Sequence, residues 1–269
     1  MRKLSLCFLI CLIVMLLVAG VRLEMRGRTA MLYPVSTAGT QVTEPTEPPE
    51  INPFTDSLAT VKVPNDTFDI ITDLDPPNNE LQDYLPQQVS IDNGRIVITA
   101  DKTEDGYVSG MAVSRMAFQY GTFAFRVSTV RGDGLFPAVW MLPAEDKPLP
   151  EIDIYELIGS RYDRFYGVLH TMDQDGLRRK YSFQKFVDDV ELPPFYVIKV
   201  RWAPDELVWY INDEPIYTIT DYIPQQPMYL IFNLAVGGNW PGNPTADTVF
   251  PNQFIVDILQ FDPEIISIR

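Results

Sequence analysis

The sequence predicts an all-β fold, a β-sandwich of antiparallel strands. From about Phe54 onward, apolar and polar residues alternate along many short segments, as they do in strands that bury one face. Clusters of Gly, Pro, Asn and Asp separate these segments every ten residues or so, which is typical of sandwiches. No sustained 3.6-residue apolar period is present in this region, so we expect few helices.

Two segments show the alternation most clearly. Residues 121–127 place Phe123, Phe125 and Val127 on one face. Residues 196–202 place four apolar side chains on one face, with the two basic side chains between them on the other. Further β-rich runs lie at residues 207–211, 228–232 and 254–261, and turn clusters lie at residues 92–94, 131–134, 203–206 and 212–215.

Composition limits the classes of function. The 269 residues carry a net charge of −15, and 46% of them are hydrophobic. A folded region of about 200 residues can bury one large core. Strong acidity excludes a typical nucleic-acid binder, because phosphate contacts need Lys and Arg. A single His excludes a catalytic His pair and a multi-His metal site, so carboxylates are the candidates for acid–base chemistry.

The N-terminus differs from the rest of the chain. Arg2 and Lys3 precede an unbroken apolar run over residues 4–21. This length is the lower limit for a membrane span and is long for a secretory signal. Two interpretations of residues 1–28 stay open: a cleaved signal peptide, or a signal anchor that tethers the protein to the membrane. Either one places the following domain outside the cell.

The remaining chain divides into a linker and a folded domain. Residues 29–53 are rich in Pro, Thr and Glu and poorer in apolar residues than the rest of the chain, so we expect an extended linker. Residues 54–269 form the predicted domain, which carries nearly all of the acidity. Both cysteines, Cys7 and Cys11, lie in the apolar run, so we expect no disulfide in the domain.

The most informative string is EIDIYE at residues 151–156. Strict alternation places Glu151 and Asp153 on one face and Glu156 on the other. A one-residue bulge between Asp153 and Glu156 would return Glu156 to the same face, and bulges are frequent beside active sites. Three carboxyl groups so close cannot all ionise freely, so at least one pKa should rise. A glycosidase needs such a pair, although a merely acidic strand face stays open from these six residues alone.

Other motifs surround this string. They are NELQDY at residues 79–84, GLFPAVWML at 134–142, GVLHT at 167–171 and NLAVGGNWPGNP at 233–244. Together with EIDIYE they resemble family 16 of the glycoside hydrolases, and within it the laminarinase-like endo-β-1,3-glucanases. The resemblance runs from about residue 54 to residue 261.

The resemblance implies a jelly-roll sandwich of two curved antiparallel sheets, with a concave catalytic cleft open at both ends. It implies that Glu151 is the nucleophile, that Glu156 is the general acid/base and that Asp153 tunes their protonation in a retaining mechanism that needs no cofactor. Strand residues four or five apart are roughly 13–16 Å apart, whereas retention requires carboxyl groups about 5–5.5 Å apart. We therefore expect the bulge and the sheet curvature to close this gap.

The resemblance also implies residues that bind the substrate. These candidates are Asn79, Phe136, Trp140, His170, Asn239 and Trp240. Trp140 fits a core position equally well, whereas the Gly-rich surroundings of Trp240 favour a loop that stacks on sugars. Asp257 matches a position near a calcium site on the convex face of many family members, so it is a candidate ligand for structural calcium.

Three departures from the family pattern concern the substrate. Phe136 stands where Trp is common, Met111 stands where Arg often contacts sugar, and residues 146–150 lack the usual Trp and Gly. We expect an endo-acting enzyme that cleaves β-1,3 or mixed β-1,3/1,4 glucosidic bonds, acts as a monomer and takes a polysaccharide rather than nucleic acid. Alternatives are the same fold acting on a galactan such as agarose or carrageenan, a transglycosylase, and a non-catalytic glucan-binding module.

Overall fold

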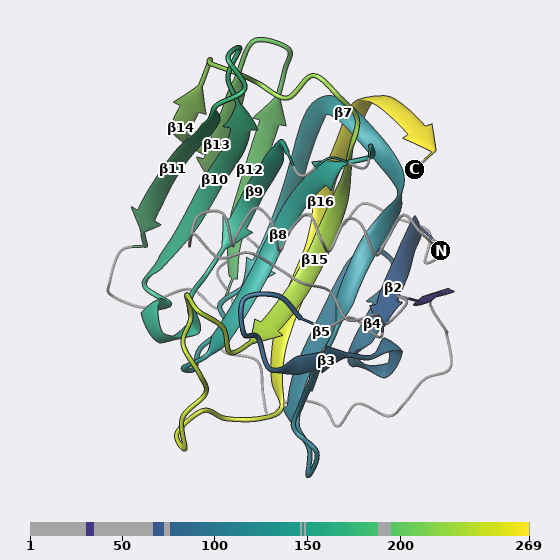
Figure 1. Ribbon diagram of the computed structural model, residues 1–269, viewed down its shortest axis with the longest axis vertical. Helices are drawn as coiled ribbons and strands as arrows, with labels where there is room; N and C mark the ends of the chain where they lie inside the picture. The colour runs from purple at the N-terminus through teal and green to yellow at the C-terminus, as the bar shows by residue number, and fades with distance from the viewer. Residues whose placement is uncertain are drawn as a thin grey trace.

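The computed structural model describes residues 31–34, 67–72, 76–145, 147, 149–187 and 195–268 (Figure 1). The predicted export segment, with both cysteines, lies outside these ranges, as does most of the predicted linker. The short strand β1 (Met31–Pro34) falls within the linker range and pairs with β2 (Phe68–Thr72). Within the described ranges, no helix has the length and apolar character needed to cross a bilayer.

The described residues are almost entirely strands. After β1 and β2 these are β3 (Gln82–Tyr84), β4 (Val89–Asp92), β5 (Arg95–Lys102), β6 (Tyr107–Ser109), β7 (Met111–Ser128), β8 (Leu135–Pro143), β9 (Glu151–Glu156), β10 (Arg164–Met172), β11 (Arg178–Phe186), β12 (Phe195–Trp202), β13 (Leu207–Ile211), β14 (Glu214–Ile219), β15 (Met228–Val236) and β16 (Asn252–Ile268). Two short 3-10 helices, η2 (Pro86–Gln88) and η3 (Gly159–Arg161), accompany them. No described residue belongs to an α-helix, which confirms the expectation of few helices.

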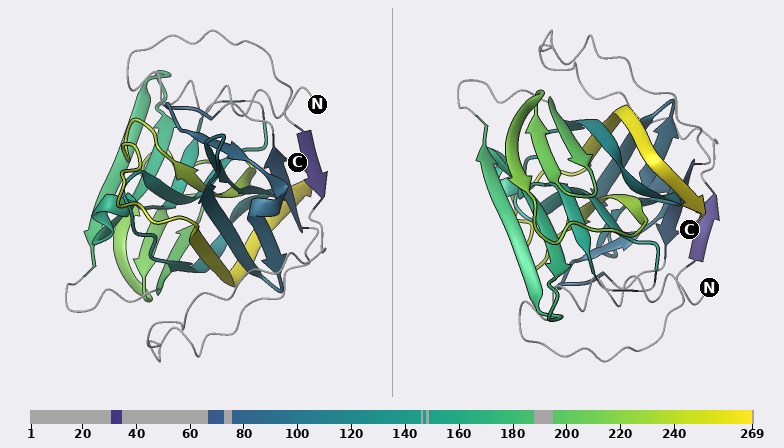
Figure 2. Two further views of the ribbon diagram at one scale, coloured as in Figure 1. Left: turned by 90° about the horizontal axis from the view of Figure 1, so that it is seen from below. Right: turned by 90° about the horizontal axis from the view of Figure 1, so that it is seen from above.

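The strands form two layers that pack face to face (Figure 2). One layer has the order β11–β10–β9–β8–β15–β7. The other has the order β14–β13–β12–β7–β16–β5–β4. Neighbouring strands within both layers are antiparallel, so the predicted sandwich is confirmed. A small third sheet pairs β3 with β6 in parallel and β6 with β5.

The long strand β7 belongs to both layers, which the sequence did not indicate. Its first half pairs with β15, and its second half pairs with β12. The two layers are therefore one continuous hydrogen-bonded sheet folded over on itself. The fold-over coincides with Tyr120 and Gly121, whose φ angles are +60° and +122°. Such angles are unfavourable for most residues but accessible to glycine, so Gly121 permits the bend.

The core between the layers consists of the side chains that the alternation predicts. Phe123, Phe125 and Val127 are fully buried, and Trp202 is buried beside them. A second apolar cluster lies on the other face of the β9–β8–β15 layer, around Tyr84, Met111 and Trp140. The layer is thus packed on both sides over part of its area, and it leaves a cavity beside β9.

Replacement of Gly121 tests the bend of β7. A Cβ atom at this position would lie 2.3 Å from the carbonyl oxygen of Asp262, a backbone atom that cannot move alone. We expect Gly121→Ala to lower the free energy of unfolding by roughly 2–4 kcal/mol. Gly176→Ala is the matched control, because Gly176 has a φ of +74° but no heavy atom near its Cβ position, and we expect a loss of about 1 kcal/mol. Equal losses in urea unfolding would contradict this role of Gly121.

Candidate active site

The strand β9 carries the site and contains the predicted bulge. On β8, Val139 pairs with Tyr155, but the next residue, Trp140, pairs with Asp153, so Ile154 is the extra residue. The pairing with β10 shifts at the same place. Ile152, Ile154 and Tyr155 are all fully buried in the core between the layers. The bulge therefore reverses the alternation, as predicted, and Glu156 faces the same side as Glu151 and Asp153.

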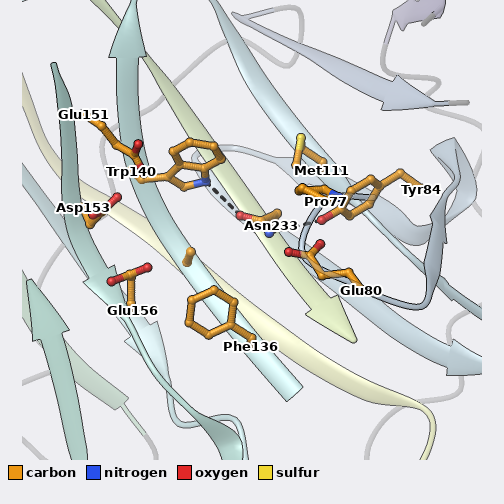
Figure 3. A pocket seen from close by; sticks show the side chains of 11 residues that line it. Pro77, Glu80, Tyr84, Met111, Phe136, Trp140, Glu151, Asp153, Glu156 and Asn233 are labelled. Carbon is orange, nitrogen blue, oxygen red and sulfur yellow. Dashed lines mark hydrogen bonds between the residues drawn. The ribbon is translucent and has the colours of Figure 1, made fainter. Parts of the chain in front are cut away.

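The three acids line a cavity of about 330 Å³, which His170, Lys180 and Trp240 also line. They also line a smaller adjoining pocket, shown in Figure 3, whose wall includes Trp140 and Asn233. Glu151, Asp153 and Glu156 are only 3%, 3% and 7% exposed. Directly paired residues of neighbouring strands share a face of the sheet. The pairing of Asp153 with Trp140 and of Glu151 with His170 therefore places the indole and the imidazole beside the carboxyl groups.

Burial dominates the charge state of the acids. It raises the pKa of Glu151 and of Glu156 well above the ordinary value, and the neighbouring carboxyl groups raise both further. Burial also raises the pKa of Asp153, to about 7. Lys180 of β11 acts in the opposite direction on all three. The coupled carboxyl groups thus retain protons at neutral pH, as the general acid needs in order to protonate a leaving group, whereas the group that acts as nucleophile must give up its proton.

His170 borders the acids as a neutral side chain. Its Nε2 atom is 3.7 Å from Oδ2 of Asp153. Burial, with a smaller contribution from the charges of Lys180 and Arg178, lowers the pKa of His170 to about 4. Glu151, Asp153 and His170 also offer ligand atoms within 4.8 Å of one another. A cation bound there would occupy the carboxyl groups that the chemistry needs.

Aromatic side chains form the floor and one end of the cavity. Trp140 is 9% exposed, and its Nε1 donates to Oδ1 of Asn233 at 2.9 Å (Figure 3). Trp240 is 46% exposed and packs edge-to-face on Phe136 and Tyr166, with ring centroids 5.3 and 4.9 Å apart. Trp140 is therefore a packed residue with an edge in the cavity, whereas Trp240 presents an open ring.

The two predicted asparagines form a pair. Nδ2 of Asn79 donates to Oδ1 of Asn239 at 2.8 Å. Asn239 lines the cavity, whereas Asn79 is exposed and lies outside the residues that line it. This geometry makes Asn79 a support for Asn239.

Glu80 lines the cavity opposite the acids, and the sequence reasoning assigned it no role (Figure 3). Burial raises its pKa to about 7, although hydrogen bonds from Gln82 and Asn78 oppose the shift. Gln82 donates to Oε2 of Glu80 at 2.8 Å and accepts from the N–H of Val236 at 2.7 Å, which ties Glu80 to β15. The alternation of Glu80, Gln82 and Tyr84 within the NELQDY motif is the signal that could have found it.

The expectation of calcium at Asp257 does not fit the structure. Its fully buried carboxylate accepts hydrogen bonds from Arg95 at 2.7 and 3.1 Å and from Arg126 at 2.8 and 2.6 Å. Two guanidinium groups already surround this carboxylate, and their charges would repel a cation. The side chain of Asp257 therefore joins β16 to β5 and β7 and is not a calcium ligand.

Comparisons with known proteins agree with this geometry. The family described as "Glycosyl hydrolases family 16" matches residues 80–250. A beta-glucanase of Rhodothermus marinus is 30% identical over 211 residues, which cover 68% of this chain and 74% of that protein. The endo-1,3-1,4-beta-glycanase ExsH of Rhizobium meliloti is 32% identical over 55% of this chain, but the match spans only 34% of that longer protein.

Solved structures give the same result. The endo-beta-1,3-glucanase of Pyrococcus furiosus is 30% identical, with a TM-score of 0.57, over 71% of this chain and 82% of that one. The catalytic domain of a laminarinase from Thermotoga petrophila is 26% identical, with a TM-score of 0.62, over 74% of this chain and 92% of that one. The fold, the bulged strand of acids and these matches lead to one conclusion: the chain belongs to family 16 of the glycosyl hydrolases.

Proposed function

We propose that this domain is a retaining, endo-acting hydrolase of β-glucans that cleaves internal β-1,3 or mixed β-1,3/1,4 glucosidic bonds. The observation that carries the proposal is the bulge at Ile154, because it brings Glu151 and Glu156 to one buried, aromatic-lined cavity. The names of the relatives, beta-glucanase and endo-1,3-beta-glucanase, support the substrate class.

In this proposal the two glutamates divide the chemistry. The carboxylate of Glu151 attacks the anomeric carbon while Glu156 gives its proton to the departing oxygen, so that a covalent glycosyl-enzyme forms. Glu156, now ionised, then takes a proton from the water that releases the sugar from Glu151. The raised pKa of Glu156 favours its protonated form before the first step.

Asp153 and His170 support this pair. Asp153 lies between the glutamates on β9, and the charge on its carboxyl group changes the pKa of both. His170 stays neutral at the pH where the glutamates exchange protons. It therefore adds no fixed positive charge that would favour ionisation of Glu156.

The setting of the enzyme is also part of the proposal. The apolar run at residues 4–21 supports export, either as a secreted protein or with a membrane tether and the domain outside. The chemistry needs no cofactor, because carboxyl groups carry every proton transfer. We propose that the enzyme acts as a monomer.

Substitution of the glutamates tests the catalytic roles. We expect Glu151→Gln and Glu156→Gln each to lower kcat on laminarin by roughly 10³-fold or more, because an amide neither attacks nor transfers a proton. The measurement is reducing-sugar release from laminarin, lichenan and agarose, with circular dichroism as the check on folding. Glu145→Gln is the control, since this exposed residue lies outside the cavity. Full activity in either catalytic variant would remove that residue from its role.

The open ring of Trp240 tests the binding surface. We expect Trp240→Ala to lower kcat/KM on laminarin about tenfold, mainly through KM, because the sugar loses a stacking platform. Tyr162→Ala removes an aromatic ring that is also exposed but does not line the cavity, and it should leave kcat/KM unchanged. A loss confined to kcat would argue that Trp240 positions the acids instead.

The buried carboxyl group of Asp153 should lower the free energy of unfolding at high pH, where it must ionise. The pKa of Asp153 is raised from 3.8 to about 7 on folding. The contribution of this group to the free energy of unfolding is therefore fully present below pH 3.8 and is lost as the pH rises through 7. We therefore expect Asp153→Asn to raise the free energy of unfolding by roughly 1–3 kcal/mol at pH 8 and by little at pH 3.

A matched variant isolates the effect of burial. Asp205→Asn removes the same charge from an exposed turn and should change stability by less than about 0.5 kcal/mol at either pH. Urea unfolding at both pH values is the measurement. An Asp153→Asn protein that is less stable than the wild type at pH 8 would contradict a destabilising charge on Asp153.

A further inference from the structure

The edge strand β11 carries two basic side chains on the side of the catalytic cavity, of which one lines the cavity. Lys180 pairs with His170 and Arg178 pairs with Met172, so both share the face of β10 that borders the acids. Lys180 lines the cavity itself. Arg178 lies two residues further along the strand, roughly 7 Å away, and its charge reaches His170. The cavity thus continues into a positively charged edge.

These two cations differ from most others in the described part of the chain. Eight of its lysines and arginines make ion pairs, namely Arg95, Arg115, Arg126, Lys147, Arg164, Arg179, Lys199 and Arg201. Arg179, between Arg178 and Lys180, turns to the other face of β11 and pairs with Asp173 at 2.6 Å. No described carboxylate lies within ion-pair distance of Arg178 or Lys180, although the protein carries 36 acidic residues against 21 basic ones.

We propose that Arg178 and Lys180 bind an anionic group, a carboxylate or a sulfate, on the polysaccharide, so that the preferred substrate is an acidic rather than a neutral β-glucan. The inference rests on the proposed function and adds a substrate class to it. An exposed cation without an internal partner keeps its donors free for a ligand, and charge-assisted hydrogen bonds are the strong ones.

The opposite wall explains why the anion binds on this side. Glu80 lines the cavity across from the β9 acids and would repel an anion when ionised. The whole domain, with its net negative charge, repels a polyanion in the same way. The pair on β11 offsets this repulsion at one place and so fixes the direction in which a charged chain enters. A strip of two cations is too small for a nucleic acid, which needs many phosphate contacts.

The charge on Lys180 also lowers the pKa of the acids, and a role confined to that effect is the competing explanation. The two explanations differ for Arg178, which does not line the cavity and is absent from the causes that shift the pKa of Glu151 or Glu156. If the cations only adjust the pKa values of the acids, Arg178→Gln should leave kcat/KM unchanged on every glucan. If they bind an anion, Arg178→Gln should remove the preference for anionic over neutral glucans.

The test compares neutral laminarin with lightly carboxymethylated and lightly sulfated laminarin of the same chain length. We expect the wild-type kcat/KM to be about tenfold higher on at least one anionic form. Most of this advantage should disappear in about 1 M NaCl, where the Debye length is about 3 Å. Arg178→Gln should lose the advantage and keep its activity on neutral laminarin.

Lys185→Gln is the control, because Lys185 is exposed on the opposite face of β11. It should retain the preference for the anionic form. Lys180→Gln should lose the preference and also shift the pH profile on neutral laminarin. Equal kcat/KM on neutral and anionic forms in the wild type, or an unchanged ratio in Arg178→Gln, would overturn the inference.

A binding measurement separates this inference from the proposed function. Calorimetric titration of Glu151→Gln with each glucan gives the ratio of Kd values without turnover. If the wild type releases no reducing ends from any of the three glucans, the proposed function is wrong. The Kd ratio, and its loss on addition of Arg178→Gln to this background, then decides the anion site independently.

Discussion

A single extra residue in β9 determines the chemistry of this protein. Ile154 is bulged out of register with β8 and β10, and the shift returns Glu156 to the face that already holds Glu151 and Asp153. Without it, Glu156 would point into the core between the layers, where Tyr155 now lies beside Phe165 and Phe254. A buried carboxyl group among aromatic rings would be costly and chemically useless. The bulge therefore solves a packing problem and assembles the acids in the same step.

Holding three buried carboxyl groups together requires a rigid support. β9 is flanked on both sides by antiparallel strands, and the layer behind it packs a core of large aromatic side chains. The fold-over of β7 at Gly121 joins that layer to the second one, and Asp257 joins β16 to β5 and β7 through two arginines. These features join the strands of the two layers on which β9 packs. A looser sandwich would relax by separating the carboxyl groups, and their raised pKa values would fall.

Local patterns predicted what depends on neighbouring residues. Alternation gave the buried faces of β7 and β12, and the spacing of Glu151, Asp153 and Glu156 required the bulge. Features that depend on residues far away in the sequence could not be predicted from local patterns. The fold-over at Gly121 depends on the backbone of Asp262, and the fate of Asp257 depends on Arg95 and Arg126, from β5 and β7. The calcium interpretation does not fit this carboxylate for that reason: an isolated strand Asp looks the same in the sequence whether a metal ion or a guanidinium group faces it.

The distribution of charge follows the same logic. In the described residues most cations pair with a neighbouring acid, although acids outnumber cations in the chain by 36 to 21. At the cavity, the acids of β9 face Glu80 on one side and Lys180 on the other. Burial raises the pKa values of the two glutamates, and the positive charge of Lys180 limits how far they rise. Because the same cation is exposed and lies next to Arg178, the residue that moderates the acids also faces the substrate. Catalytic protonation and recognition of a charged glucan are then coupled through one side chain.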